Sequence, residues 1–174
     1  VASDPATTGG SLEVVAFYGY DPFNRRIYRA VAGQNTLYSV YDGWREIEEV
    51  AHDPGGPQNQ VERVYTWGQG LDELLSYTRR TGPGTWQRLY AHQDRMGSVV
   101  RLVNDQGAAV EGYEYDAYGA VRVFGIAGAV ETPIGVSAYG NPYLFTGRRL
   151  DVETGLLYLR NRYYHTGSGR FMTV

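Results

Sequence analysis

The segment Tyr113-Glu-Tyr-Asp-Ala-Tyr-Gly119 joins a strand-forming run to the start of a turn, and this combination recurs along the chain. Tyrosine favours a pleated strand, and an aspartate directly after it can accept backbone N–H groups where a turn begins. The same pair occurs at Tyr20-Asp21 and Tyr41-Asp42, and degenerate copies start at Tyr65 and Tyr90. The successive steps are 21, 24, 25 and 25 residues. A period of this size predicts one supersecondary unit that is stacked several times.

Strand-forming runs alternate with turn residues over most of the chain, and helices of normal length are not required. Asp42-Gly43 between two such runs predicts a two-residue hairpin turn, since this turn needs positive φ angles. The pattern predicts an all-β fold, a curved antiparallel sheet of consecutive β-hairpins. The expected strands are Leu12–Tyr20, Arg25–Val31, Leu37–Tyr41, Trp44–Val50, Val61–Trp67, Leu71–Thr78, Trp86–His92, Ser98–Val103, Ala108–Tyr115, Ala120–Phe124, Tyr143–Thr146 and Leu156–Arg162.

Four segments are expected from the changes in composition. Residues 1–14 read as a flexible N-terminal end, and residues 15–124 as the hairpin repeats. Residues 125–141 are rich in Gly and Ala and predict a long connection. Residues 142–174 form the last segment. His52–Asn59 is a further Pro/Gly loop.

Composition excludes several classes of function. The chain has 174 residues, a net charge of −3 and no cysteine, so a disulfide framework and a thiolate metal site are both impossible. The negative charge disfavours nucleic-acid binding as a whole-chain property. The sequence has no apolar run of the length that spans a membrane and no signal-peptide pattern at Val1.

The second half of the chain resembles the RHS/YD-repeat family. His92-Gln-Asp-Arg-Met-Gly-Ser98 followed by Asn104-Asp-Gln-Gly107 is similar to one family motif, and Tyr113–Gly119 is similar to its Y-x-Y-D-x-x-G motif. The last segment resembles the start of the RHS repeat-associated core. The matching stretches there are Tyr143–Gly147, Asp151–Leu156, Arg162–Tyr164 and Gly169–Phe171.

The resemblance implies a spiral of β-hairpins that closes into a hollow shell. Family members include bacterial polymorphic toxins, the C components of insecticidal toxin complexes and the animal teneurins. The bacterial shells hold a C-terminal toxic cargo, so the resemblance implies a secreted or cell-surface location. It also implies that the partners of this chain are the remaining segments of a parent RHS protein and its C-terminal cargo.

The family core ends in an aspartyl autoprotease whose residues begin with an Asp-Pro shortly after a Gly-Arg-Phe. This sequence has Gly169-Arg-Phe171 and stops at Val174. We therefore expect the autoprotease residues to lie beyond Val174 and the chain itself not to be an enzyme. A shell of this family takes many hundreds of residues, so the chain is expected to be a wall fragment.

Several titratable residues are candidates for catalytic or metal sites, and we assign none of them to such a role. His52, His92 and His165 lie far apart without a metal-binding spacing, so structural roles are expected; a hydrogen bond inside the turn is the expected role of His92. Gly68-Gln-Gly70 lacks the rest of a dinucleotide fingerprint and reads as a turn. The sequence predicts no cofactor and no metal.

Acidic residues form two further candidates. Glu46, Glu48 and Glu49 are expected to form a solvated strand face, although Glu46 and Glu48 share a side and could pair as acid and base. Asp151 lies near Arg148 and Arg149, and an arginine beside a carboxylate suits an ion pair better than a general acid.

Arginines and tyrosines alternate near the C-terminal end. This pattern can bind single-stranded nucleic acid, but packing of Arg on Tyr faces by cation–π contact is the preferred interpretation. The residues are Arg148, Arg149, Arg160, Arg162, Arg170, Tyr158, Tyr163 and Tyr164.

The function that these observations favour is a structural wall of a shell that encapsulates a C-terminal toxin or effector. A cell-surface carbohydrate-binding or adhesion module is one alternative, and part of an aspartyl autoprotease completed beyond Val174 is another. A fragment of a spiral also has unpaired strand edges, which predicts self-association through them.

Overall fold

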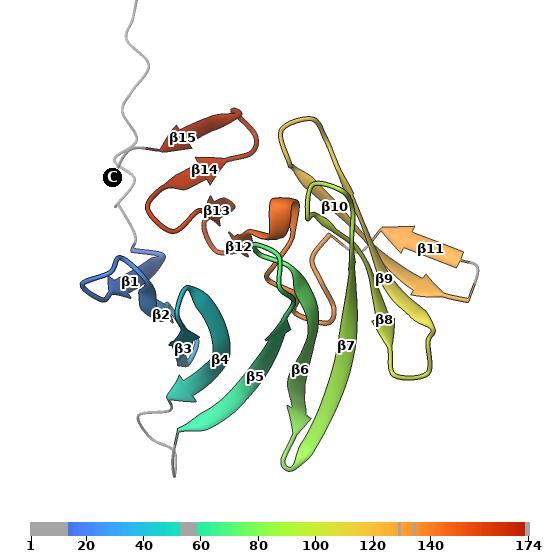
Figure 1. Cartoon of the computed structure of the whole chain (residues 1–174), viewed down its shortest axis with the longest axis horizontal. Coiled ribbons are helices and arrows are strands. Elements are labelled where there is room, and N and C mark those ends of the chain that lie inside the picture. The colour runs from blue at the N-terminus through green and yellow to red at the C-terminus, as the bar shows by residue number, and fades with distance from the viewer. Residues whose placement is uncertain (1–13, 53–58, 129, 134, 173–174) are drawn as a thin grey trace, which may run out of the picture.

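The computed structural model describes residues 14–52, 59–128, 130–133 and 135–172. An eleven-stranded antiparallel sheet contains most of them, with its strands side by side in chain order (Figure 1). The strands are β1 (Ala16–Tyr20), β2 (Arg26–Val31), β3 (Thr36–Asp42), β4 (Arg45–His52), β5 (Gln60–Trp67), β6 (Leu74–Gly82), β7 (Thr85–Gln93), β8 (Val99–Asn104), β9 (Ala109–Tyr115), β10 (Val121–Ala127) and β11 (Val130–Pro133).

The C-terminal residues form a second, smaller antiparallel sheet. A 3-10 turn at Phe145–Gly147 leads into β12 (Arg149–Asp151), β13 (Leu156–Tyr158), β14 (Tyr163–His165) and β15 (Arg170–Met172). Figure 1 shows the large sheet curled into an open shell, with the smaller sheet across one end of it. The predicted curved, all-β sheet of consecutive hairpins is confirmed.

Four turns of the large sheet share one pattern of hydrogen bonds. An Asp or Asn side chain accepts the backbone N–H groups two and four residues further on, at 2.8–3.1 Å. The residue three positions on has a positive φ, which glycine adopts without steric cost. The acceptor and positive-φ residues are Asp21 with Asn24, Asp94 with Gly97, Asn104 with Gly107, and Asp116 with Gly119. The turn role predicted for the aspartate of the repeat is confirmed for Asp21 and Asp116, whereas Asp42 is the last residue of β3.

Antiparallel pairing places every second turn at the same end of the sheet. The turns that follow the odd-numbered strands β1, β3, β5, β7 and β9 therefore lie along one edge, which we call the YD rim. These turns are Asp21–Asn24, Gly43–Trp44, Gly68–Glu73, Asp94–Gly97 and Asp116–Gly119. The repeat of the sequence thus marks one end of the sheet.

Two turns differ in detail from their prediction. The loop between β3 and β4 is Gly43–Trp44, because Asp42 already pairs with Arg45. Gly43 has a positive φ of 58° and is the first of the two loop residues. The sequence predicted Asp42 and Gly43 as the two loop residues. The strand expected over Leu71–Thr78 begins at Leu74, because Asp72 adopts a positive φ of 55° and ends the preceding turn.

The connection predicted for residues 125–141 is wrong over much of its length. Strand β10 continues to Ala127 and pairs with β11, so a further hairpin stands at the edge of the sheet. Gly125 opposes Thr132 within this hairpin, since glycine in a strand does not prevent ladder hydrogen bonds. The other boundaries of the four predicted segments remain predictions, and the first thirteen residues and 53–58 lie outside the described residues.

The core lies on the inner face of the large sheet. Tyr65, Leu74, Tyr77, Leu89, Val99, Leu102, Tyr113 and Val123 come from strands β5 to β10, and Tyr143 and Leu144 come from the C-terminal segment. The ring of Tyr143 lies edge-on to Tyr65 and Trp67, with centroids 5.2 and 4.9 Å away. A single sheet face cannot exclude water alone, so the C-terminal segment completes this core.

Candidate functional site

The C-terminal segment from Ser137 to Tyr164 contacts the large sheet from one side to the other. At the first turn of the YD rim, the Tyr158 hydroxyl donates to the Asn24 carbonyl at 3.0 Å. At the last turn, the Tyr164 hydroxyl donates to the Tyr118 carbonyl, also at 3.0 Å. The segment therefore links hairpins that are adjacent neither in the sequence nor in the sheet.

The middle turns of the YD rim are held by charge and by backbone contacts. Asp72 accepts ion pairs from Arg148 at 2.9 Å and from Arg160 at 2.6 Å. The Val99 N–H donates to the Leu144 carbonyl at 3.1 Å. Asp72 lies in the third turn of the rim, and Val99 is the first residue of β8, just after the fourth turn.

Residues just before the smaller sheet are anchored on a buried carboxylate. Glu111 of β9 is fully buried and accepts the Ser137 hydroxyl at 2.6 Å and the Ala138 N–H at 2.8 Å. The Tyr113 hydroxyl also donates to Glu111. The Tyr77 hydroxyl donates to the Tyr139 carbonyl at 3.1 Å. These residues fall inside the predicted connection, and their hydrogen bonds hold them on the sheet.

Arg149 lies at the centre of a buried ionic network. Its guanidinium donates from Nη1 to Glu46 at 2.9 Å and from Nη2 to Glu49. Glu49 also accepts from Arg63 of β5, and Glu46 accepts the Tyr143 hydroxyl. Glu46, Glu49 and Arg149 are 4%, 1% and 6% exposed, so this network is screened from water.

The expectation of a solvated face at Glu46, Glu48 and Glu49 is wrong for Glu46 and Glu49. An extra residue in β4, opposite the step from Val40 to Tyr41, shifts the register of the β3–β4 pair. Such a bulge puts two residues three positions apart on the same side of a strand. Glu46 and Glu49 therefore both point at Arg149, while Glu48 is left half-buried on another side.

The network fixes the protonation state of its members. Burial disfavours the charged form of Glu49, but the guanidinium groups of Arg149 and Arg63 outweigh burial and hold its pKa well below the usual range. Burial raises the pKa of the Tyr143 hydroxyl, and the nearby Glu46 raises it further. Glu49 is therefore a permanent anion and Tyr143 a permanent donor, so neither is a general acid or base near neutral pH.

Asp151 forms an ion pair, as expected, but with a different arginine. Arg26 of β2 binds both of its oxygen atoms, at 2.6 and 2.9 Å. The Nε atom of Arg149 lies farther away, 3.8 Å from Oδ1. Arg148 pairs with Asp72 instead. The sequence showed no signal for Arg26, because its partner lies 125 residues further along the chain.

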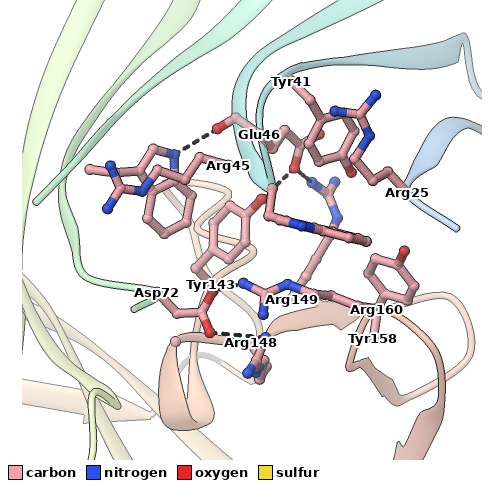
Figure 2. Close-up of a pocket in the computed structure, with 13 residues that line it drawn as sticks. Arg25, Tyr41, Arg45, Glu46, Asp72, Tyr143, Arg148, Arg149, Tyr158 and Arg160 are labelled. Carbon is pink, nitrogen blue, oxygen red and sulfur yellow. Dashed lines mark hydrogen bonds and ion pairs between the residues drawn. The ribbon is translucent and has the colours of Figure 1, made fainter. Parts of the chain in front are cut away.

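A small cavity of about 50 Å³ lies between the YD rim and the smaller sheet. Figure 2 shows Tyr143 and Arg149 on one side of it, and Asp72 with Arg148 below. Arg25, Arg45 and Arg160 also line it, but Arg25 pairs with Asp21 and Arg160 with Asp72. The cavity is thus a gap among groups that hold the segment in place.

The three histidines lie apart, as expected for structural roles. His52 Nδ1 is 2.8 Å from Asn59 Oδ1, and His165 Nδ1 is 2.9 Å from Ser168 Oγ. His92 is exposed, and the hydrogen bond expected for it inside the turn is made by its neighbour Gln93 to the Gly97 carbonyl at 2.7 Å. Across the described residues, His, Asp and Glu side chains form no group of three that could hold a metal ion.

The C-terminal arginines do lie over aromatic rings, but over different rings from those named in the sequence pattern. Arg160 lies 5.9 Å from the Trp44 centroid, and Arg162 lies 4.1 Å from the Phe171 centroid. The Tyr158 ring instead receives Arg26, at 4.5 Å. In the part of the chain that the structure describes, no helix is long and apolar enough to cross a membrane.

Comparisons with known proteins identify relatives of this chain. No family model matches the chain. The chain is 30% identical over 168 residues to the tRNA3(Ser)-specific nuclease WapA of Bacillus spizizenii and to the tRNA nuclease WapA of Bacillus subtilis. It is 26% identical over 180 residues to the toxin protein Tse5 of Pseudomonas aeruginosa. The matches cover 97% and 90% of this chain, but only 6% of either WapA protein and 13% of Tse5.

Solved structures of toxin-complex components resemble the chain as well. The crystal structure of TcdB2-TccC3 without the hypervariable C-terminal region superposes with a TM-score of 0.56 at 18% identity, covering 90% of this chain and 7% of that one. TcdB2-TccC3-TEV gives 0.52 at 18% identity, covering 95% and 8%.

At such low identity these likenesses show the fold alone, which is a curved antiparallel sheet of consecutive hairpins. The resemblance to RHS/YD-repeat proteins is confirmed, and the relatives named here are two tRNA nucleases and a toxin protein.

Proposed function

We propose that this chain is part of the wall of an RHS-type shell and that it works by confinement, without bond chemistry of its own. The wall keeps a C-terminal cargo polypeptide away from solvent and from other proteins. The remaining segments of a parent RHS protein and that cargo are its partners, and the assembled protein is secreted or displayed at a bacterial cell surface.

One observation carries this proposal: the inner face of the large sheet already holds a length of polypeptide. Glu46, Glu49 and Glu111 present buried carboxylates to the segment that begins at Ser137. A wall that binds its own chain through specific buried ion pairs has an inner face built for contact with protein. A freely solvated sheet face would have no use for buried carboxylates, because unpaired burial of a charge is strongly unfavourable.

Protease accessibility of the complete polypeptide encoded by the gene tests confinement. The same cleavage sequence is inserted either downstream of Val174 or into the exposed turn Asn104–Gly107, which lies at the end of the sheet opposite the YD rim. We expect the turn insertion to be cut rapidly in the folded protein and the downstream insertion to be cut only after unfolding. Equal cutting of both sites in the folded protein would refute confinement.

A nuclease activity is the competing proposal, because the WapA relatives are named as tRNA nucleases. The matched region makes up only 6% of each relative, so their names do not locate the activity within it. Here the clustered carboxylates of Glu46, Glu49 and Asp151 each bind arginine, so among them only Glu46 Oε1 is left without a hydrogen-bond partner, and a metal would find a single free oxygen. We expect the 174-residue chain to leave bacterial tRNA intact. Cleavage that Glu46→Gln abolishes would assign the activity to this network.

A carbohydrate-binding module is the second competitor. Trp44, Trp86 and Tyr118 are 50%, 45% and 60% exposed and could stack on sugars. They lie on different hairpins, and among the described residues none of the three pairs with another aromatic ring. An inert wall binds none of the glycans on an immobilised panel, and saturable binding that Trp86→Ala removes would favour the module instead.

A further inference from the structure

A second and larger cavity, of about 310 Å³, lies between the inner face of the sheet and the segment that crosses it. Its apolar walls come from Val121 and Val123 of β10 and from Leu144 and Leu150 of the C-terminal segment. Val136 and Val152 also line it and are 64% and 65% exposed, so they mark its mouth. A volume of this order is in the range of small-ligand sites.

Four residues that line this cavity carry a buried N–H group without an acceptor among the described residues. The atoms are Arg29 Nε, Arg63 Nε, Arg149 Nε and Asn141 Nδ2. Asn141 and Arg149 are 5% and 6% exposed, so both side chains are nine-tenths buried. Buried polar groups of folded proteins are nearly always satisfied, so four unsatisfied donors around one cavity call for a common acceptor.

The carboxylates nearby leave these donors free for geometric reasons. Glu153 binds Nη1 of Arg29, and Glu49 binds Nη1 of Arg63. Glu46 and Glu49 bind the two Nη atoms of Arg149. Each guanidinium therefore binds its carboxylate partners through Nη atoms, and Asp151 Oδ1, 3.8 Å from Arg149 Nε, is too far away for a hydrogen bond. No acidic residue is among the described residues that line the cavity, and the carboxylates of Glu49, Asp151 and Glu153 beside these arginines are themselves paired with arginine.

We propose that this cavity binds a carboxylate carried on a short apolar chain. The carboxylate oxygen atoms accept from the Nε–H groups and the Asn141 amide, and the alkyl part packs on the valine and leucine walls. Phosphate fits less well, because it is polar on all sides and would leave those walls in contact with a charged oxygen surface. The same chemistry is found in a free short-chain acid and in the C-terminal residue of a polypeptide that ends in an apolar side chain.

Titration of the 174-residue chain followed by methyl resonances of Val121 and Val123 tests the site. The probes are butyrate, its uncharged analogue butyramide, inorganic phosphate and N-acetylvaline, which mimics the end of a polypeptide. We expect saturable shifts with butyrate and none with butyramide. A response to N-acetylvaline shows that a chain end can enter, and a response to butyrate alone assigns the site to free acids. No saturation with either carboxylate, or equal responses to butyrate and to butyramide or phosphate, overturns the proposal and leaves only water to satisfy the donors.

Two variants locate the binding. Val136→Trp fills the mouth of the cavity without touching a donor and should abolish the butyrate shifts. Val130→Trp is its matched control, since Val130 is 63% exposed but lies on β11 away from the cavity, and it should bind as the parent chain does. Arg63→Lys keeps the charge beside Glu49 and removes one Nε–H; binding should weaken about tenfold, the loss expected for one hydrogen bond to a charged group. Equal affinity in all three variants would contradict this location.

Discussion

Arg26 and Asp151 form a two-pronged ion pair that ties the second strand of the large sheet to the first strand of the small one. Their side chains are 3% and 0% exposed. The Arg26 guanidinium also lies over the rings of Tyr18 and Tyr158, at 4.8 and 4.5 Å. The pair therefore joins two sheets within an environment that water does not reach.

Replacing Asp151 by alanine should destabilise the chain and change nothing else. It leaves Arg26 as a buried charge without its partner, and breaking such a pair costs about 3–5 kcal/mol. Urea unfolding followed by tyrosine fluorescence measures the loss. Glu114→Ala is the control, because Glu114 and Arg122 are 56% and 77% exposed in their pair and such pairs contribute little. Asp151→Ala with parental stability, or any processed band that depends on Asp151, would show that the residue has another role.

Alanine substitutions at two turn glycines should distinguish the stability cost of backbone strain from the cost of a steric clash. Gly107 and Gly119 occupy the same turn position with φ of 77° and 89°. A Cβ at Gly107 would meet no atom within 4 Å, whereas one at Gly119 would overlap the Phe145 ring. We expect Gly107→Ala to cost about 1 kcal/mol from the positive φ alone. Gly119→Ala should cost about 2 kcal/mol more, a typical penalty for overpacking.

Those two costs are read from denaturant midpoints of the two variants. Phe145→Ala in the Gly119→Ala background should recover part of the difference, because it removes the ring that the new methyl group meets. If the two glycine variants lose the same stability, the contact between the last rim turn and Phe145 is not made in solution.

Acid should unfold the chain partly through Glu49. Its pKa in the folded state lies below the ordinary value of 4.5, because Arg149 and Arg63 outweigh burial. The folded state therefore binds fewer protons than the unfolded state, and stability is fully present above about pH 5 and decreases as the pH falls through and below 4.5. Unfolding free energies between pH 7 and pH 3 measure this slope. Glu49→Gln should lower stability at pH 7 and flatten the acid slope; a parental slope would assign the acid loss to other carboxyl groups.

Alkali should unfold the chain because it favours deprotonation of the tyrosines that are buried in the folded state. Burial, with the nearby charge of Arg26 in opposition, raises the pKa of Tyr158 to about 12, and burial raises the pKa of Tyr65 and Tyr77 as well. A raised pKa means that the folded state keeps protons that the unfolded state loses. Stability is therefore constant below pH 10 and decreases above it. Tyrosinate absorbance near 295 nm should rise in one cooperative step that coincides with loss of the sheet, and a gradual rise in the folded state would contradict this.

Free strand edges should make the chain associate. Strand β11 is the last of the large sheet, and all four of its residues are exposed. Light scattering across a concentration series should show growing mass. Val130→Lys should reduce it by placing a charge on the edge, while Val152→Lys, equally exposed but off that edge, should not. A single monomeric mass at every concentration would exclude edge pairing.

The sequence predicted local structure better than the site. The Tyr-Asp repeat and its glycines determine turns by short-range hydrogen bonds, so Asp21, Asp94 and Asp116 could be assigned from neighbouring residues alone. The burial of Glu46 and Glu49 depends on a one-residue bulge and on Arg149, which lies 100 residues from Glu49. Single-sequence patterns carry no information about such contacts. The only available hint was that acidic residues concentrate in one strand and arginines in the C-terminal segment.

The long sequence separations of these contacts impose an order of events during synthesis. A ribosome releases the hairpins of the large sheet first, while Arg26, Glu46 and Glu49 still lack the partners Asp151 and Arg149 that arrive 100 to 125 residues later. Until then their charges hold water on the inner face and oppose premature collapse. The inner face of the large sheet is thus covered only after the segment around Arg149 has been synthesised, so we expect a chain truncated before Arg149 to leave these charges hydrated.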